Sequence, residues 1–210
     1  MTLLEYTLFA FTSMFVIVDP VATVPAFLAM TPHNSLVQQN RMALLASAVA
    51  AGVLMGFALA GPWLFKILGI TLPAFQIAGS LLLMRIALDM LYAQRTRERQ
   101  TDEEVQAGTK MEDVAITPLG VPMLAGPGAI STALILLNQA TDIAQRVALF
   151  VCILGVCFWS YVILRIGAHG ARFLNPLALK LITRLMGLLL AAIAVQFIVN
   201  GLAELPLFKK

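Results

Sequence analysis

Long apolar stretches separated by short polar ones dominate the chain. A helix needs about 20 apolar residues to cross the hydrocarbon core of a bilayer. Apolar runs of roughly this length occur at about residues 5–30, 43–66, 71–92, 114–138, 146–167 and 181–203. The pattern therefore predicts an all-α membrane protein with six transmembrane helices.

The composition points the same way. Of the 210 residues, 60% are hydrophobic and 12% are charged, and the mean hydropathy is +0.90, whereas globular proteins contain about 45–50% apolar and about 25% charged residues. Glu5 is the first charged side chain, so the basic segment of a cleavable signal is missing and we expect the first run to remain as a span. No basic run with interleaved aromatic residues predicts nucleic-acid binding.

One sizeable polar segment, Gln94 to Asp113, divides the single transmembrane domain 1–210 into halves of about residues 1–93 and 114–210. A solvated linker is favoured over a regulatory site for this segment. On its side of the membrane lie nine basic residues: Arg41, Arg95, Arg97, Arg99, Lys110, Arg165, Arg172, Lys180 and Arg184. The other side has four: Lys66, Arg146, Lys209 and Lys210. The positive-inside rule therefore predicts a cytoplasmic central loop, with both termini outside the plasma (inner) membrane.

The first span is interrupted by Asp19, Pro20 and Pro25. A carboxylate in hydrocarbon costs at least ~2.5–3.5 kcal/mol, and prolines remove backbone donors and interrupt a regular helix. Two roles for Asp19 stay open: it binds a coupling ion or proton, or it caps the helix after the break. The cost of its position favours the functional role.

The fourth span carries a second break. It contains Thr117, Pro118 and Pro122 and then the block Gly126-Pro127-Gly128. Freed backbone groups of this kind are tolerated only where they are buried in protein or line a cavity. The start of a half-helix favours an anion such as a substrate carboxylate, while freed carbonyls favour a cation. For the two glycines, close helix packing and exposure of backbone to a substrate are equally favoured.

Equal spacings relate the two halves. Pro20 and Pro127 lie 107 positions apart, as do Ala87 and Ala194. Because each half has three spans, an odd number, the halves must enter the membrane from opposite sides. The spacing thus predicts two inverted three-helix repeats with broken helices 1 and 4, an architecture of many secondary transporters.

Other polar residues have simpler explanations. For Gln76, Gln196 and Asn200, interhelical hydrogen bonds are slightly favoured over a functional role. Arg85 and Asp89 are spaced to pair on one helix face. We expect His33 and His169 in connecting loops, and Cys152 and Cys157 as buried filler without a disulfide or metal.

Five motifs together make the chain resemble the MarC family of six-span membrane proteins, also described as neutral amino acid transporters: Asp19 to Phe27, Phe75 to Gly79, Thr117 to Pro122, Ala125 to Ala129 and Val195 to Gly201. The resemblance implies transport of small neutral amino acids such as alanine or glycine, coupled to an ion gradient. Ala22 and Thr23 replace a Gly and an Asn of the family's first motif, and Gly79-Ser80 replaces paired glycines. These departures leave the substrate preference open.

The leading hypothesis is a secondary active transporter of small neutral solutes that works by alternating access. Asp19 would carry H⁺ or Na⁺, and no cofactor or metal is expected. The alternative is a passive channel or facilitator, and no catalytic constellation predicts an enzyme. The expected partners are a small neutral amino acid and the bilayer, and a homo-oligomer stays open. The candidate binding residues are Asp19, Pro20, Ala22, Thr23, Pro25, Gln76, Gly79, Thr117, Pro118, Pro122, Gly126, Pro127, Gly128, Gln196 and Asn200.

Overall fold

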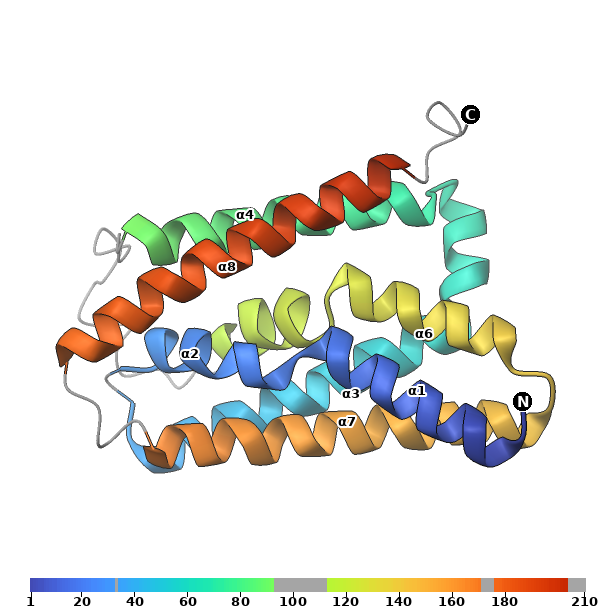
Figure 1. The fold of residues 1–210 in the computed structure, drawn as a ribbon, viewed down its shortest axis with the longest axis horizontal. Helices are drawn as coiled ribbons and strands as arrows, with labels where there is room; N and C mark the ends of the chain where they lie inside the picture. The colour runs from blue at the N-terminus through green and yellow to red at the C-terminus, as the bar shows by residue number, and fades with distance from the viewer. Residues whose placement is uncertain (33, 93–112, 171–175, 204–210) are drawn as a thin grey trace.

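The computed structural model describes residues 1–32, 34–92, 113–170 and 176–203. His33, most of the central polar segment, Lys209 and Lys210 lie outside this part. The described chain is helical throughout (Figure 1), with α1 (Leu3–Val18), α2 (Pro20–Met30), α3 (Leu36–Leu68), α4 (Leu72–Tyr92), η2 (Ala115–Leu124), α6 (Pro127–Gln139), α7 (Ile143–Gly170) and α8 (Pro176–Ala203).

The helices supply five to six candidate membrane spans. Five are long and apolar enough on their own, counting α1 and α2 as one, and the pair η2 and α6 makes a sixth with a bend of 53°. This agrees with the predicted all-helical membrane protein. α1 begins and α8 ends at the same end of the molecule (Figure 1), which an even number of spans requires. The orientation relative to the two sides of the membrane stays a prediction.

Capping residues explain why helices begin where they do. At the start of α1, Thr2 Oγ1 accepts from the backbone N–H of Glu5 at 3.3 Å, and Glu5 Oε2 accepts from the N–H of Thr2 at 2.8 Å. Ser35 and Gln38 form the same reciprocal pair at the start of α3. Such pairs satisfy backbone donors that a helix leaves free. They let α3 begin at Leu36, well before the apolar run predicted from about residue 43.

α7 also extends beyond its predicted apolar run. It continues to Gly170, so His169 lies in its last turn. The prediction that His169 sits in a connecting loop is therefore wrong. The reason is that a helix can continue past the hydrocarbon once its polar side chains reach the headgroup region, which an apolar pattern does not reveal.

α4 and α8 form an antiparallel pair along one side of the molecule (Figure 1). Glycines of α8 pack closely against α4 near both ends of α4. A Cβ on Gly187 would lie 2.9 Å from the carbonyl oxygen of Ala87, and one on Gly201 would lie 3.1 Å from that of Pro73. Small residues let backbones approach closely where van der Waals packing drives helix association.

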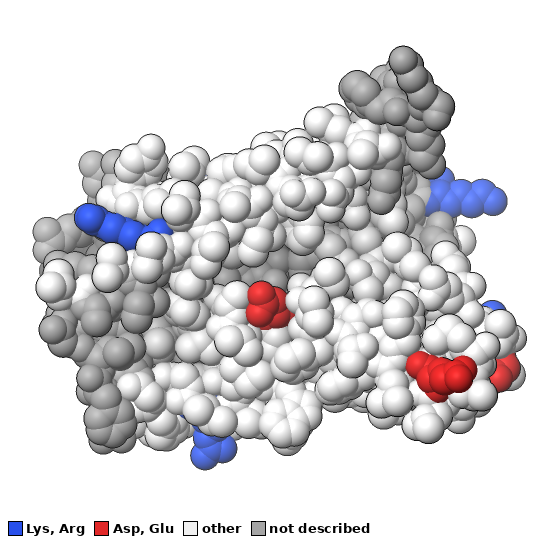
Figure 2. Space-filling model, in the orientation of Figure 1, with Lys and Arg blue, Asp and Glu red and all other residues white. Residues whose placement is uncertain are grey.

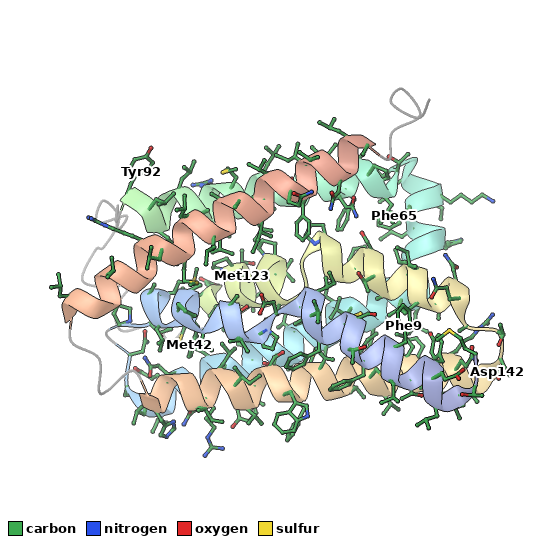
Figure 3. All side chains as sticks on the ribbon, in the orientation of Figure 1. Phe9, Met42, Phe65, Tyr92, Met123 and Asp142 are labelled. Carbon is green, nitrogen blue, oxygen red and sulfur yellow. The ribbon has the colours of Figure 1, made fainter. Side chains whose placement is uncertain are left out.

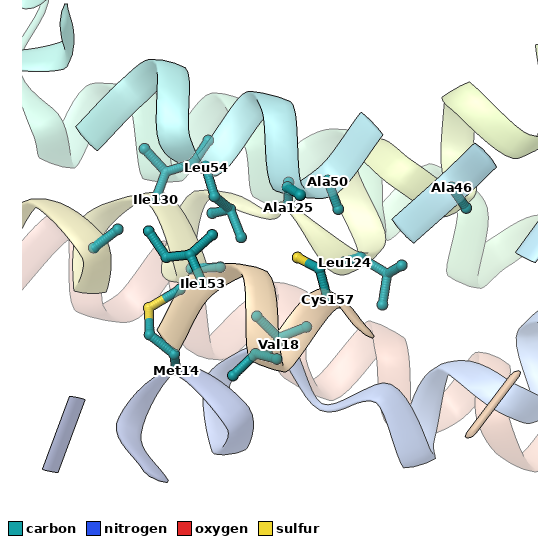
Figure 4. Close-up of a cluster of buried hydrophobic side chains, with 14 of the residues drawn as sticks. Met14, Val18, Ala46, Ala50, Leu54, Leu124, Ala125, Ile130, Ile153 and Cys157 are labelled. Carbon is teal, nitrogen blue, oxygen red and sulfur yellow. The ribbon is translucent and has the colours of Figure 1, made fainter. Parts of the chain in front are cut away.

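The main core lies among α1, α3, η2, α6 and α7. α3 presents an alanine-rich face to it, and Figure 4 shows Ala46, Ala50 and Leu54 of α3 near Leu124 and Ile153 of the facing segments. Figure 3 shows Met123 among the helices and Tyr92 pointing away from them. Large apolar side chains such as Val151 and Leu188 are more than half exposed, at 61% and 59%, which suits a surface that meets lipid.

Candidate functional site

The first break consists of one residue. Asp19 ends α1 and starts α2 with a left-handed backbone, φ 43° and ψ 65°. Its N–H donates to the carbonyl of Phe15 at 3.1 Å, and its Oδ1 accepts from the N–H of Ala22 at 3.1 Å. Aspartate tolerates this conformation better than most residues because its short polar side chain bonds locally. The capping role considered for Asp19 is therefore present in the structure.

The Asp19 carboxylate also faces outward from the protein. Its side chain is exposed, and within the described chain no Lys or Arg pairs with it. In Figure 2, charge gathers mostly toward the two ends of the molecule, but one acidic side chain lies in the middle of the viewed face beside a hollow. Oδ2 thus stays available to a ligand while Oδ1 holds the helix start.

The second break is wider and differently built. In η2, Thr117 and Val121 have extended backbones, as expected for residues that precede proline. Gly126 precedes α6 without a side-chain cap, and a Cβ there would lie 2.6 Å from the carbonyl oxygen of Pro122. Only glycine fits this close approach. The start of α6 consequently has free backbone donors and the positive end of a helix dipole without a carboxylate of its own.

α4 and α8 both contact the first turn of α6. A Cβ on Gly79 would lie 2.7 Å from Cγ of Pro127, and one on Gly128 would lie 2.7 Å from Cζ of Phe197. These contacts place α4 and α8 against the uncapped start of α6, which is buried. Gly79, Pro127 and Gly128 are thereby brought together from two predicted motifs.

A buried polar chain accompanies these contacts. Gln76 Nε2 donates to Ser131 Oγ at 3.0 Å, and Ser131 Oγ donates to the carbonyl of Pro127 at 2.7 Å. Gln76 is 9% exposed, and its Oε1 has no partner among the described residues. The amide therefore links α4 to α6 and keeps one buried acceptor available.

The two breaks lie close to each other. A Cβ on Gly128 would lie 3.5 Å from Cγ2 of Ile17, two residues before Asp19. Figure 4 shows Val18 and Ala125, which directly precede the two capping positions, in the same cluster of buried side chains. The end of α1 and the uncapped start of α6 thus pack together, while the Asp19 carboxylate itself is exposed.

The remaining predicted residues fall into three groups. Pro20, Thr23 and Pro122 are buried, Ala22, Pro25 and Pro118 are partly buried, and Thr117 is exposed. Thr23 Oγ1 donates to the carbonyl of Asp19 at 3.1 Å.

Gln196 and Asn200 are exposed and bond to each other within α8, where Gln196 Nε2 donates to Asn200 Oδ1 at 2.8 Å. Within the described residues, neither side chain bonds to another helix as favoured, because both are exposed and lie one turn apart on the same face of α8.

Sequence reasoning missed two residues of this region. Ser131 joins Gln76 to α6, and Phe197 covers Gly128. Ser131 lies one turn after Pro127, which is a signal for a hydroxyl that bonds the first-turn carbonyl. Phe197 offers no signal of its own, since a phenylalanine in an apolar span is ordinary.

No group of three or more His, Cys, Asp or Glu side chains within the described ranges could hold a metal ion. Cys152 and Cys157 are free and buried, as expected of filler residues. Arg85 is exposed, and the side chain of Asp89 lies outside the described part, so their pairing stays a prediction.

Comparisons with known proteins give matches over nearly the whole chain. The family model described as "MarC family integral membrane protein" matches residues 4–206. A "UPF0056 membrane protein" of Aquifex aeolicus is 37% identical over 93% of this chain and 92% of its own length. "UPF0056 membrane protein MJ1677" of Methanocaldococcus jannaschii is 36% identical over 95% and 97%. "UPF0056 membrane protein YhcE" of Escherichia coli is 31% identical over 91% and 89%.

No solved structure gives a significant match to this fold.

Proposed function

The chain belongs to the MarC family of integral membrane proteins, and from this premise we propose that it is a secondary active transporter of small neutral solutes. The substrates are amino acids such as alanine or glycine, and a proton or sodium gradient drives the transport. The proposal rests on two breaks that lie close together inside candidate membrane spans: one has an uncapped helix start, and the other has an exposed carboxylate that no described Lys or Arg pairs with.

The electrostatics of the two breaks suit a zwitterion. The first turn of α6 offers N–H donors and a positive dipole end to the carboxylate of an amino acid. Oδ2 of Asp19 and the unpartnered Oε1 of Gln76 offer acceptors to an ammonium group or to a coupling cation. Among the described residues that build the two breaks, Asp19 alone has an acidic side chain, and we assign coupling to it.

The pattern of helix packing supports an inverted repeat. α1 packs on α7, and η2 correspondingly packs on α3. α2 contacts α7 and α8, and α6 contacts their counterparts α3 and α4. Exchanging the two halves therefore reproduces the main contacts, as a pseudo-two-fold axis would require. Alternating access then consists of the α4–α8 pair moving against the remaining helices around the two breaks.

The test is uptake of labelled alanine into proteoliposomes, with and without imposed proton or sodium gradients. We expect accumulation above equilibrium that Asp19→Asn abolishes, because asparagine keeps the cap but not the charge. Asp142→Asn is the matched control, since Asp142 likewise caps a helix, accepting from the N–H of Gln145 at 2.7 Å.

Equilibration without accumulation would contradict coupling and indicate a passive facilitator. Accumulation that survives Asp19→Asn would remove Asp19 from the coupling step. The absence of any gradient-dependent flux from folded protein, across the small neutral amino acids, would overturn the proposal.

A further inference from the structure

The outer face of α7 carries a shallow depression near the end of the helix. Its volume is about 410 Å³, and Tyr161, Val162, Arg165, Ile166 and His169 line it. All five residues belong to the last three turns of α7. The depression is separate from the two breaks, because none of its lining residues belongs to either break.

This face points away from the rest of the protein. Gly167 packs against Val24 of α2. At about 100° per residue, Arg165 and His169 lie roughly opposite to Gly167 on the helix. Ile166 is 65% exposed, and Phe158, about two turns earlier on this outer face, is 61% exposed. Such a face meets lipid when the helix spans a membrane.

The polar groups of the depression are arranged to receive an acceptor. Arg165 Nη1 donates to the phenol oxygen of Tyr161 at 3.3 Å, so the phenol O–H remains to donate outward. His169 Nδ1 donates to the carbonyl of Arg165 at 2.8 Å. Within the described chain no carboxylate pairs with Arg165. The guanidinium keeps further donors in the fork geometry that matches a phosphate.

The depth of these residues matches a lipid headgroup. α7 has 28 residues and is therefore about 42 Å long, longer than the ~30 Å hydrocarbon core. Its last turns reach the interface, where tyrosine is enriched and where arginine extends its charge toward water. The apolar side chains of Phe158, Val162 and Ile166 lie below and beside them on the same face.

We propose that this face of α7 binds an anionic phospholipid of the adjacent leaflet. Arg165 and Tyr161 hold the headgroup phosphate, and the acyl chains lie along Phe158, Val162 and Ile166. The unpaired positive charge beside an apolar strip is what distinguishes this face from an ordinary lipid-facing surface. The site does not depend on the proposed transport activity.

The two tryptophans of the chain, Trp63 and Trp159, allow a local test. Trp159 is 50% exposed and its ring contacts that of Phe158, with centroids 6.2 Å apart. In a Trp63→Phe background, Trp159 is the single tryptophan. Its fluorescence quenching by brominated phosphatidylglycerol in phosphatidylcholine bilayers then reports the local lipid composition. The reverse variant, Trp159→Phe, reports the same quantity at Trp63 of α3.

We expect phosphatidylglycerol to be enriched roughly fivefold near Trp159, the effect of about one basic group at a membrane surface. No such enrichment is expected near Trp63. Arg165→Gln should remove the enrichment and Arg165→Lys should retain part of it. Arg146→Gln, the matched change at the other end of α7, should leave the enrichment unchanged.

Equal enrichment at both tryptophans, or enrichment that survives Arg165→Gln, would overturn the proposal. Loss of the enrichment on adding inorganic phosphate, but not chloride of equal ionic strength, would also overturn it and assign the site to free phosphate.

Discussion

The two breaks start a new helix inside a membrane span in opposite ways. At the first, Asp19 supplies a carboxylate to the start of α2, so the break is one residue long and its helix start is capped. At the second, Gly126 supplies no side chain, and α6 begins uncapped after a wide, proline-rich turn. The difference teaches that only the second break leaves a positive helix end for an outside anion, while the first leaves a negative charge for a cation.

The largest effect on stability is expected at the second break. Gly126→Ala places a methyl group against the carbonyl oxygen of Pro122, a backbone atom that cannot move aside. We expect a loss of roughly 1–3 kcal/mol in the free energy of unfolding, measured by thermal or denaturant unfolding in detergent. Gly52→Ala is the control, because nothing lies within 4 Å of the Cβ it would add. Equal stability of the two variants would show that the second break is not constrained at this residue.

The first break should respond to the loss of its cap. Asp19→Ala removes the acceptor of the Ala22 N–H and leaves a residue that tolerates φ 43° poorly, which together cost about 1–2 kcal/mol. Asp19→Asn keeps both properties and should change the free energy of unfolding by only a few tenths of a kcal/mol. If both variants lost the same stability in an unfolding titration, the charge rather than the cap would hold this break.

Gly128 should be more tolerant than Gly126. The methyl group of Gly128→Ala meets the ring of Phe197, which can rotate or shift, so we expect a cost of about 1 kcal/mol. Phe197→Leu removes the ring atoms concerned and should relieve most of that cost. A double-mutant cycle on the free energy of unfolding measures this coupling, and additive effects would contradict the contact.

The smallest effect concerns the link between α4 and α6. Combining Gln76→Leu with Ser131→Ala in a second cycle should give a coupling of about 0.6 kcal/mol, the average for hydrogen bonds between membrane helices. The value is small because the polar groups of helices separated in the membrane also find other hydrogen-bond partners. A coupling above ~2 kcal/mol would indicate that this bond is central to the second break.

Individual residues show how far sequence reasoning reached. The interruptions at Asp19-Pro20 and at Gly126-Pro127 were predictable, because prolines and a carboxylate are incompatible with a regular span. The hydrogen bond between Gln196 and Asn200 within α8 could not be distinguished in the sequence from a bond to another helix. Polar residues in an apolar helix are compatible with either kind of hydrogen bond. The place of His169 in α7 was hidden, because helix continuation beyond the hydrocarbon leaves no apolar signal.

The sequence by itself determined the helical spans and the positions of both breaks, because span length, charge and proline act through local physical costs that apply in any fold. Only the tertiary structure decided that α4 and α8 pack against the start of α6, that Ser131 and Phe197 belong to this region, and that Arg165 lies on the exposed face of α7. These facts depend on which helix faces meet, and in a chain that is apolar on nearly every face, hydrophobicity does not select those faces. Close packing of small residues selects them instead.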